Sequence, residues 1–193
     1  MTIIQVPAPK GYTGATLHLE LDPTEHERRQ ACRLSGITNP GLLDTLMALP
    51  QGHLVPYAAL TKRQKYDVHR APRGVLHYAD SMVTRLAVRP GRVHLATVRS
   101  PTCSRTALGN ASKFAPFCAR AVICRIPPVR PETVAEFSFW GVGILIEHAN
   151  GELETVIEPE PHVVKRHTPA AWQFVEQAYA AYLTHTAPDR TSA

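Results

Sequence analysis

Three side chains in the middle of the sequence have the chemistry of a hydrolytic site. Asp67, His69 and His77 are carboxylate and imidazole groups of the kind that take part in metal-assisted cleavage of a phosphodiester. The ordinary interpretation is that the aspartate lies on the solvent-exposed face of a helix and that the histidines lie on the surface. These residues therefore support an alternative function, an enzyme acting on a phosphate-bearing substrate, either nuclease-like or nucleotide-modifying.

Cys103 is the candidate nucleophile of the same alternative. It follows an expected strand and lies between Arg99 and Arg105 in the sequence. Neighbouring guanidinium groups lower the pKa of a thiol, and the thiolate is the reactive form. The sequence assigns no base to Cys103, so it defines no catalytic pair. The favoured interpretation is a protein that is not an enzyme.

The histidines and cysteines lack the spacing of a metal site. His162 and His167 lie five apart in an expected loop, and the sequence has no His-Glu-x-x-His or Cys-x-x-Cys motif. Cys103, Cys118 and Cys124 are separated by 15 and 6 positions, outside the usual spacings of zinc ligands. We expect no metal and no cofactor. The four cysteines are expected to be reduced, although an even count also permits two disulfides.

Basic residues are concentrated in the middle of the chain. The sequence has 21 Lys and Arg against 16 Asp and Glu, which gives a net charge of +5 and a pI near 9.2. Residues 51–130 contain eleven Arg and three Lys but only two acids, a net charge of +12. Residues 1–50 carry −1 and residues 131–193 carry −6. The modest overall charge therefore conceals a basic segment between acidic ends.

Two interpretations of this basic segment remain open. Arginine pairs with phosphate through a planar fork, and a clustered basic face attracts nucleic acid. Alternatively, the acidic C-terminal part, residues 131–186, folds against the basic segment and neutralises it. A third hypothesis makes the same pairing intermolecular, so that basic and acidic surfaces of neighbouring copies build a homo-oligomer.

The predicted phosphate-binding residues lie in three parts of the basic segment. Two strand-like runs over residues 83–98 flank Arg-Pro-Gly-Arg, the chemistry of a type II turn, and predict an arginine-rich hairpin. A short helix after Pro56 carries a second basic patch. The hydroxyl-rich loop over residues 100–114 either holds an anion or is a purely structural loop. Tyr66 and Tyr78 either stack on bases or pack in the core. The predicted nucleic-acid-binding residues are Lys62, Arg63, Lys65, Arg70, Arg85, Arg89, Arg92, Arg99, Arg105 and Lys113.

The order of the expected elements indicates an α+β fold. They are a strand at 16–21, helices opening at 22–24 and 39–40, the short helix after Pro56, the hairpin at 83–98, a strand at 119–126, a second hairpin at 135–157 and a helix at 168–185. We expect one domain, residues 1–186, with an antiparallel sheet built from the two hairpins. The N-terminal helices and the C-terminal helix pack on this sheet, and residues 187–193 form a flexible tail.

The first two helices do not have the chemistry of a helix-turn-helix DNA reader. The second is rich in leucine and contains no Lys or Arg, whereas a recognition helix presents basic or amide side chains to the groove. No apolar run reaches the ~18 residues of a membrane span, and no secretory signal is visible. We therefore predict a cytoplasmic, non-catalytic protein without contact to a membrane. Its expected partner is nucleic acid, either DNA or RNA, with DNA the favoured one.

Overall fold

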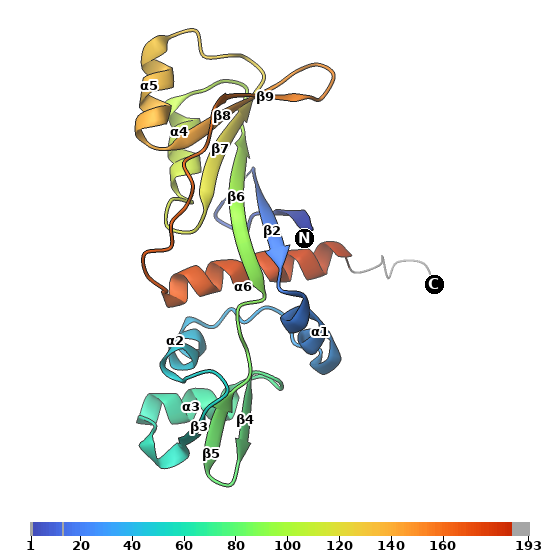
Figure 1. The fold of residues 1–193 in the computed structure, drawn as a ribbon, viewed down its shortest axis with the longest axis vertical. Coiled ribbons are helices and arrows are strands. Elements are labelled where there is room, and N and C mark those ends of the chain that lie inside the picture. Colours follow the sequence, from blue (N-terminus) through green and yellow to red (C-terminus); the bar gives the residue numbers. More distant parts are fainter. Residues whose placement is uncertain (1, 13, 187–193) are drawn as a thin grey trace, which may run out of the picture. The chain divides into compact units, whose positions relative to one another are not determined.

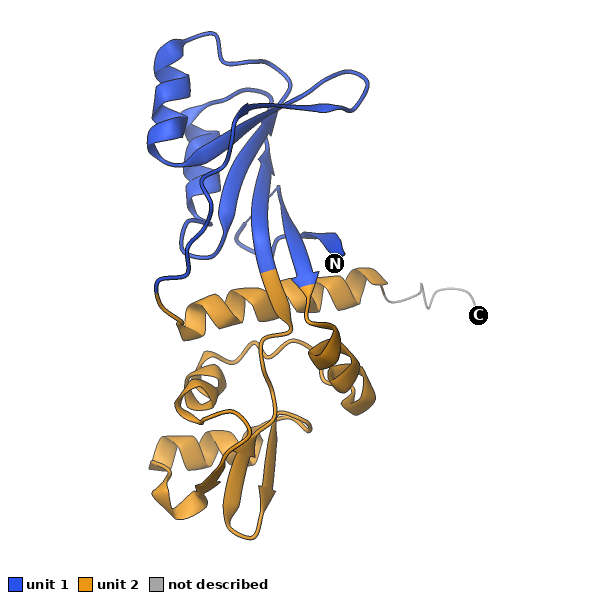
Figure 2. Ribbon diagram, in the orientation of Figure 1, with its two compact units in different colours: residues 1–20, 93–165 blue, residues 21–92, 166–193 orange. Residues whose placement is uncertain are grey.

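The computed structural model describes residues 2–12 and 14–186. It divides into two compact units, which we call unit 1 (residues 1–20 and 93–165) and unit 2 (residues 21–92 and 166–193) (Figure 2). The α+β class is confirmed, because helices and strands occur in both units. The single-domain boundary at residue 186 stays a prediction, and the predicted tail at 187–193 lies outside the described residues.

Unit 1 is built on a six-stranded sheet. Its strands are β1 (Ile3–Pro7), β2 (Ala15–Leu21), β6 (Gly91–Arg99), β7 (Ala119–Cys124), β8 (Val142–Glu147) and β9 (Leu153–Ile157), in the order β1-β2-β6-β7-β8-β9 (Figure 1). β7 pairs in parallel with both β6 and β8, whereas the β1–β2 and β8–β9 pairs are antiparallel. The sheet is therefore mixed, and the expectation of an antiparallel sheet is wrong for its β6–β7 and β7–β8 pairs.

Two helices connect the three parallel strands, α4 (Arg105–Ser112) and α5 (Pro131–Phe139). α5 corrects the predicted strand over residues 135–146, of which only the second half is extended. Pro131 in the first turn and Glu132 beside it favour a helix start, and Phe137 faces the core. The chain leaves the helix at Gly141, whose φ of +64° suits glycine, and β8 follows directly.

The predicted hairpin over residues 83–98 is wrong. Its first half forms β5 (Met82–Arg85), which pairs with β4 (Leu76–Ala79) and β3 (Leu54–Pro56) in a separate three-stranded sheet. Its second half is β6 of the larger sheet. The tight turn lies earlier, at Asp80 and Ser81, which have φ values of 50° and 61°, as a type I′ hairpin turn requires.

The residues of the expected Arg-Pro-Gly-Arg turn have a different role. The carbonyl of Pro90 accepts a hydrogen bond from the backbone N–H of Asp22, at 3.0 Å. The carbonyl of Val88 accepts one from the guanidinium of Arg29, at 2.8 Å. Because these bonds hold the chain between β5 and β6 against its neighbours in unit 2, this stretch does not close a hairpin.

Unit 2 combines the small sheet with the remaining helices. These are α1 (Pro23–Cys32), α2 (Pro40–Ala48), the short 3₁₀ helix η1 (Tyr57–Ala59), α3 (Lys62–Arg70) and α6 (Pro169–Thr186) (Figure 1). The predicted starts are confirmed by side-chain caps at Asp22, Asn39 and Thr168. Leucines of α2 pack with Trp172 of α6 in the main core of this unit.

A buried ionic network connects α1 and α6. The fully buried guanidinium of Arg29 donates to the carboxylates of Glu25 and Glu176, each at 2.7 Å. Glu176, also fully buried, accepts further bonds from the backbone N–H of Ile37 and the indole of Trp172, both at 2.8 Å. Burial works to raise the pKa of Glu25, but hydrogen bonds from arginines outweigh it and lower that pKa. Each charge in the network is therefore paired and hydrogen-bonded.

Candidate nucleic-acid interface

Helix α3 presents Lys62, Arg63 and Arg70 to solvent because its other side is fixed in the core, while Lys65 is half-buried beside the ring of Tyr57. Val68 packs with Leu60 and Val83, and the buried Asp67 accepts a hydrogen bond of 2.7 Å from the hydroxyl of Thr45. Thr61 begins the helix with a capping box. By the helical period, the exposed side carries Lys62, Arg63, Tyr66, His69 and Arg70.

Aromatic rings lie among these cations. The hydroxyl of Tyr57 is 2.7 Å from Nε2 of His69, and the ring centroids of Tyr57 and Tyr78 are 5.3 Å apart. The guanidinium of Arg70 lies 5.3 Å from the ring centroid of Tyr66, in cation–π geometry. Tyr66 is 60% exposed and Tyr78 49%, so both rings remain largely open to solvent. We call Tyr57, Tyr78 and the α3 residues Lys62, Arg63, Lys65, Tyr66, His69 and Arg70 the α3 surface.

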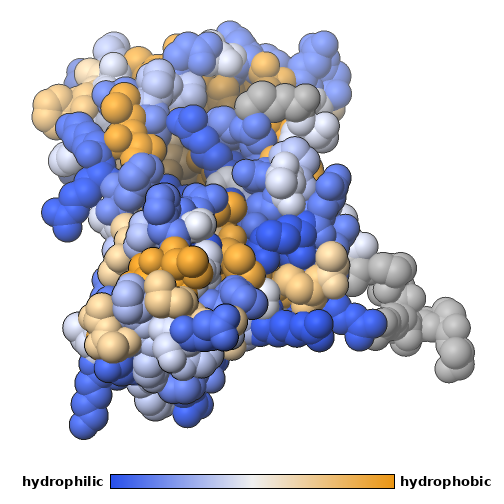
Figure 3. Space-filling view, turned by 60° about the horizontal axis from the view of Figure 1, so that its bottom comes forward, coloured by the Kyte–Doolittle hydropathy of each residue, from blue (hydrophilic) through white to orange (hydrophobic). Residues whose placement is uncertain are grey.

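The cations of the α3 surface are not neutralised within the described chain. Among residues 2–12 and 14–186, no ion pair involves Lys62, Arg63, Lys65 or Arg70. The one acid on α3, Asp67, lies on its buried side. In Figure 3, which brings the lower end of Figure 1 forward, hydrophilic side chains cover much of the visible face, with hydrophobic ones between them.

The remaining predicted residues of unit 2 lie outside α3, and two of them, Arg85 and Arg89, are partly buried. Arg85 is half-buried; it donates to the carbonyl of Leu46 at 2.7 Å and lies over the ring of Trp172 at 5.6 Å. Burial lowers the pKa values of Arg85 and Arg89. Arg85 therefore supports the core of unit 2, while Arg92 is exposed at the start of β6.

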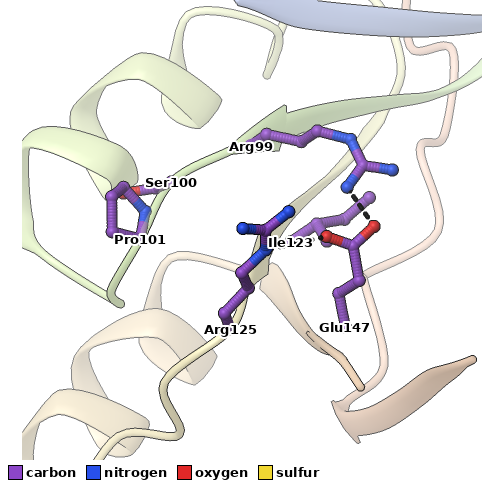
Figure 4. Close-up of a pocket in the computed structure, with 6 residues that line it drawn as sticks. All are labelled: Arg99, Ser100, Pro101, Ile123, Arg125 and Glu147. Carbon is purple, nitrogen blue, oxygen red and sulfur yellow. Dashed lines mark hydrogen bonds and ion pairs between the residues drawn. The ribbon is translucent and has the colours of Figure 1, made fainter. Parts of the chain in front are cut away.

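The three predicted residues of unit 1 all have side-chain partners, and the two arginines among them pair with acids of the C-terminal part. Arg99 forms an ion pair with Glu147, and Arg125 approaches the same carboxylate at 3.4 Å (Figure 4). Arg105 pairs with Glu136 at 3.3 Å. Lys113 donates to the side chain of Asn110 at 2.9 Å. Folding therefore pairs the predicted arginines of unit 1 with acids of the C-terminal part, the contact that the second interpretation of the sequence expects.

The three candidates for hydrolytic chemistry are not brought together as a site. Asp67 lies on the buried side of α3 and His69 on its exposed side, since residues two apart on a helix do not face each other. His77 is exposed on β4. Within the described part of the chain, no group of three His, Cys, Asp or Glu side chains could hold a metal ion.

Cys103 is also not an activated nucleophile, and the expectation of a lowered pKa is wrong. Its Sγ lies 2.8 Å from Sγ of Cys124, and both thiols are free. Burial, reinforced by the neighbouring thiol of Cys124, raises the pKa of Cys103 to about 12. The two flanking arginines do not offset this, because each is paired with a glutamate.

We therefore expect Cys103 to react slowly with iodoacetamide. At pH 8 a thiol of this pKa is ionised to roughly one part in 10⁴, against about a quarter of an ordinary thiol. After allowance for the higher intrinsic reactivity of a more basic thiolate, alkylation should be about 100-fold slower than that of free glutathione. Pulse alkylation followed by mass spectrometry of the Cys103 peptide measures this rate. In Cys124→Ala the rate should rise, whereas a wild-type rate equal to that of glutathione would restore Cys103 as a candidate nucleophile.

Comparisons with known proteins add no assignment to this geometry. No protein-family model matches the chain, and neither the curated proteins nor the solved structures include a match to it. Among the helices of the described residues, none combines the length and the hydropathy needed to cross a bilayer.

Proposed function

We propose that this protein binds nucleic acid, most readily DNA, through the α3 surface, and that it does so without catalysis. The observation that carries the proposal is the group of four α3 cations that have no acidic partner in the described chain. Phosphate groups can supply the anionic partner that these cations lack. When Lys and Arg neutralise phosphates, counterions are released from the nucleic acid.

The form of the α3 surface favours either the major groove of duplex nucleic acid or a single-stranded segment with unpaired bases as the binding partner. α3 is an exposed basic helix, and the β4–β5 ribbon follows it directly; both kinds of element enter the major groove in known modes of recognition. The exposed rings of Tyr66 and Tyr78 offer stacking surfaces for unpaired bases beside Arg70. Phosphate contacts of this kind position the protein and carry no sequence information themselves, so binding should tolerate many sequences.

Binding of the wild-type protein should weaken steeply with salt. If the four cations each contact a phosphate, the slope of log affinity against log salt concentration is about −3.6, since each contact contributes about −0.9. Fluorescence anisotropy with labelled duplex DNA, single-stranded DNA and RNA, at several salt concentrations, measures this slope.

Two outcomes decide the proposal. Saturable, salt-dependent binding to duplex DNA supports it. Stronger binding to single strands also supports it and would indicate that unpaired bases stack on Tyr66 and Tyr78. Absence of binding to all three probes at low salt would rule it out.

Light scattering without nucleic acid, at low and high salt, tests the third hypothesis, in which basic and acidic surfaces of neighbouring copies pair. A charge-driven homo-oligomer of this kind dissociates as salt rises.

A further inference from the structure

A pocket lies where the three parallel strands of unit 1 end. Its volume is about 250 Å³. β6 and β8 contribute their last residues, β7 contributes Ile123, and the chain just beyond β6 and β7 completes the wall (Figure 4). The lining residues are Arg99, Ser100, Pro101, Ile123, Arg125 and Glu147.

The strand register explains why the charged residues share one face. Arg99 pairs with Ile123 in the β6–β7 register, and side chains alternate between the faces of a strand. Arg125 therefore lies on the same face as Ile123, two residues along. Its neighbour in the β7–β8 register is Glu147, one position beyond the pair Cys124–Ile146. The intervening side chains, Val98, Val122, Cys124 and Ile146, are buried on the opposite face.

Backbone hydrogen bonds hold the walls of the pocket beyond the strand ends. The N–H of Ser100 donates to the carbonyl of Ile123 at 2.9 Å, and the N–H of Ile126 donates to the carbonyl of Pro101 at 3.3 Å. The hydroxyl of Ser100 donates to the carbonyl of Thr102 at 2.9 Å and so stabilises the turn. The two arginines are therefore attached to backbone whose position is fixed before any ligand binds.

The charged side chains that line the pocket, two arginines and one glutamate, carry a net positive charge. Arg99 and Arg125 both contact Glu147, through one nitrogen each. In the described part of the chain their other guanidinium nitrogens make no hydrogen bond, so two cations face one carboxylate. Hydrogen bonding from Arg99 lowers the pKa of Glu147, which keeps this carboxylate charged and oriented between the two guanidinium groups.

We propose that this pocket binds the phosphate group of a small phosphate ester. Two guanidinium forks need more acceptors than the two oxygens of a carboxylate, and a terminal phosphate offers three oxygens and a larger charge. Pro101 and Ile123 provide apolar wall for the organic part of the ligand. The volume is somewhat below the ~300 Å³ lower bound of typical drug-sized sites, which suits a small ester.

This site is separate from the proposed function and does not rest on it. All six lining residues belong to unit 1, whereas the α3 surface belongs to unit 2. Arg99 was predicted from the sequence as a contact to nucleic acid. The pocket instead assigns it a small ligand, together with Arg125 and Glu147, which the sequence analysis did not single out.

Titration with inorganic phosphate and with adenosine 5′-monophosphate tests the site in the full-length protein. Binding is followed by ¹H–¹⁵N NMR at constant ionic strength, with adenosine as the control that lacks a phosphate. We expect saturable shifts of the Arg99, Ser100 and Ile123–Arg125 amides at millimolar ligand for both phosphates, with tighter binding of the ester, and none for adenosine. Absence of saturation up to about ten millimolar of either phosphate overturns the proposal.

Matched variants locate the binding. The double variant Arg99→Ala/Arg125→Ala should weaken binding of the ester by at least about tenfold, and Arg99→Lys/Arg125→Lys should also weaken it, because charge is kept but the forks are lost. Arg105→Ala, an exposed and paired arginine of the same unit, should leave it unchanged. Equal binding by wild type and the Ala double variant overturns the proposal.

A comparison of 5′-phosphorylated and 5′-hydroxyl oligonucleotides in Lys62→Ala/Arg63→Ala/Arg70→Ala separates the two sources of phosphate, an oligonucleotide end and a small ester. Preference for the oligonucleotide end over the ester overturns the assignment to a small ligand.

Discussion

Replacing Lys62, Arg63 and Arg70 together with alanine should lower the affinity for duplex DNA by about 500-fold at about 100 mM salt. Each phosphate contact that releases a counterion contributes roughly a factor of eight under these conditions, and the triple variant removes three. These side chains are exposed, and in the described structure none of them is part of an ion pair, so their loss leaves the buried side of α3 intact. Fluorescence anisotropy measures the affinity.

The matched control is the triple variant Arg99→Ala/Arg105→Ala/Arg125→Ala, which changes the net charge of the protein by the same amount. Its three arginines are exposed but paired with glutamates, and surface ion pairs contribute little stability. For duplex DNA with 5′-hydroxyl ends, which offers no terminal phosphate to the unit 1 pocket, we expect its affinity to stay within about threefold of wild type. Equal losses in the two triple variants would mean that net charge alone, and not the α3 surface, determines binding.

Replacing Glu176 with alanine should lower the free energy of unfolding by about 3–5 kcal/mol. The substitution leaves the guanidinium of Arg29, which is fully buried, with Glu25 as its one remaining carboxylate partner. It also leaves the N–H of Ile37 and the indole of Trp172 without their acceptor, and buried unpaired donors are costly. Urea unfolding followed by circular dichroism and tryptophan fluorescence measures the change.

Glu154→Ala is the control for this stability prediction. Glu154 is exposed and pairs with His148 on the surface at 3.0 Å, so its removal should cost at most about 1 kcal/mol. If Glu176→Ala were as stable as Glu154→Ala, the buried network would not be a determinant of the fold of unit 2.

The parts of the fold that depend on local chemistry were predictable from the sequence. Caps at Asp22, Asn39 and Thr168 begin helices as expected, and Asn150-Gly151 closes the β8–β9 hairpin, with φ of +84° at Gly151. These features depend on residues within three or four positions of one another. The pairing of β6 with β7 and of β7 with β8 was not predictable in this way, because parallel strands pair across intervening helices.

The hairpin over residues 83–98 failed because Pro90 and Gly91 have a plausible turn sequence that the tertiary structure does not use. The carbonyl of Pro90 instead accepts a hydrogen bond from Asp22, which lies 68 positions earlier in the chain. The true turn, at Asp80 and Ser81, lacks the Gly that usually marks a type I′ turn, so the sequence signal there is weak.

The candidate site was predictable in composition but not in extent. The net charge of +12 over residues 51–130 identifies the basic segment from the sequence, including the cations that the structure places on α3. Which cations folding neutralises depends on contacts between distant positions: Arg99 and Glu147 are 48 residues apart, and Arg105 and Glu136 are 31 apart. Only the folded structure separates these paired arginines from the unpaired cations of α3.

The most direct test of this account is the salt dependence of DNA binding in the two matched triple variants. The slope of log affinity against log salt concentration should fall from about −3.6 in the wild type to about −0.9 in Lys62→Ala/Arg63→Ala/Arg70→Ala, because about 0.9 is lost with each phosphate contact. The slope of Arg99→Ala/Arg105→Ala/Arg125→Ala should remain near the wild-type value. A wild-type slope in the α3 variant, or a reduced slope in the unit 1 variant alone, would contradict the assignment of the nucleic-acid interface to α3.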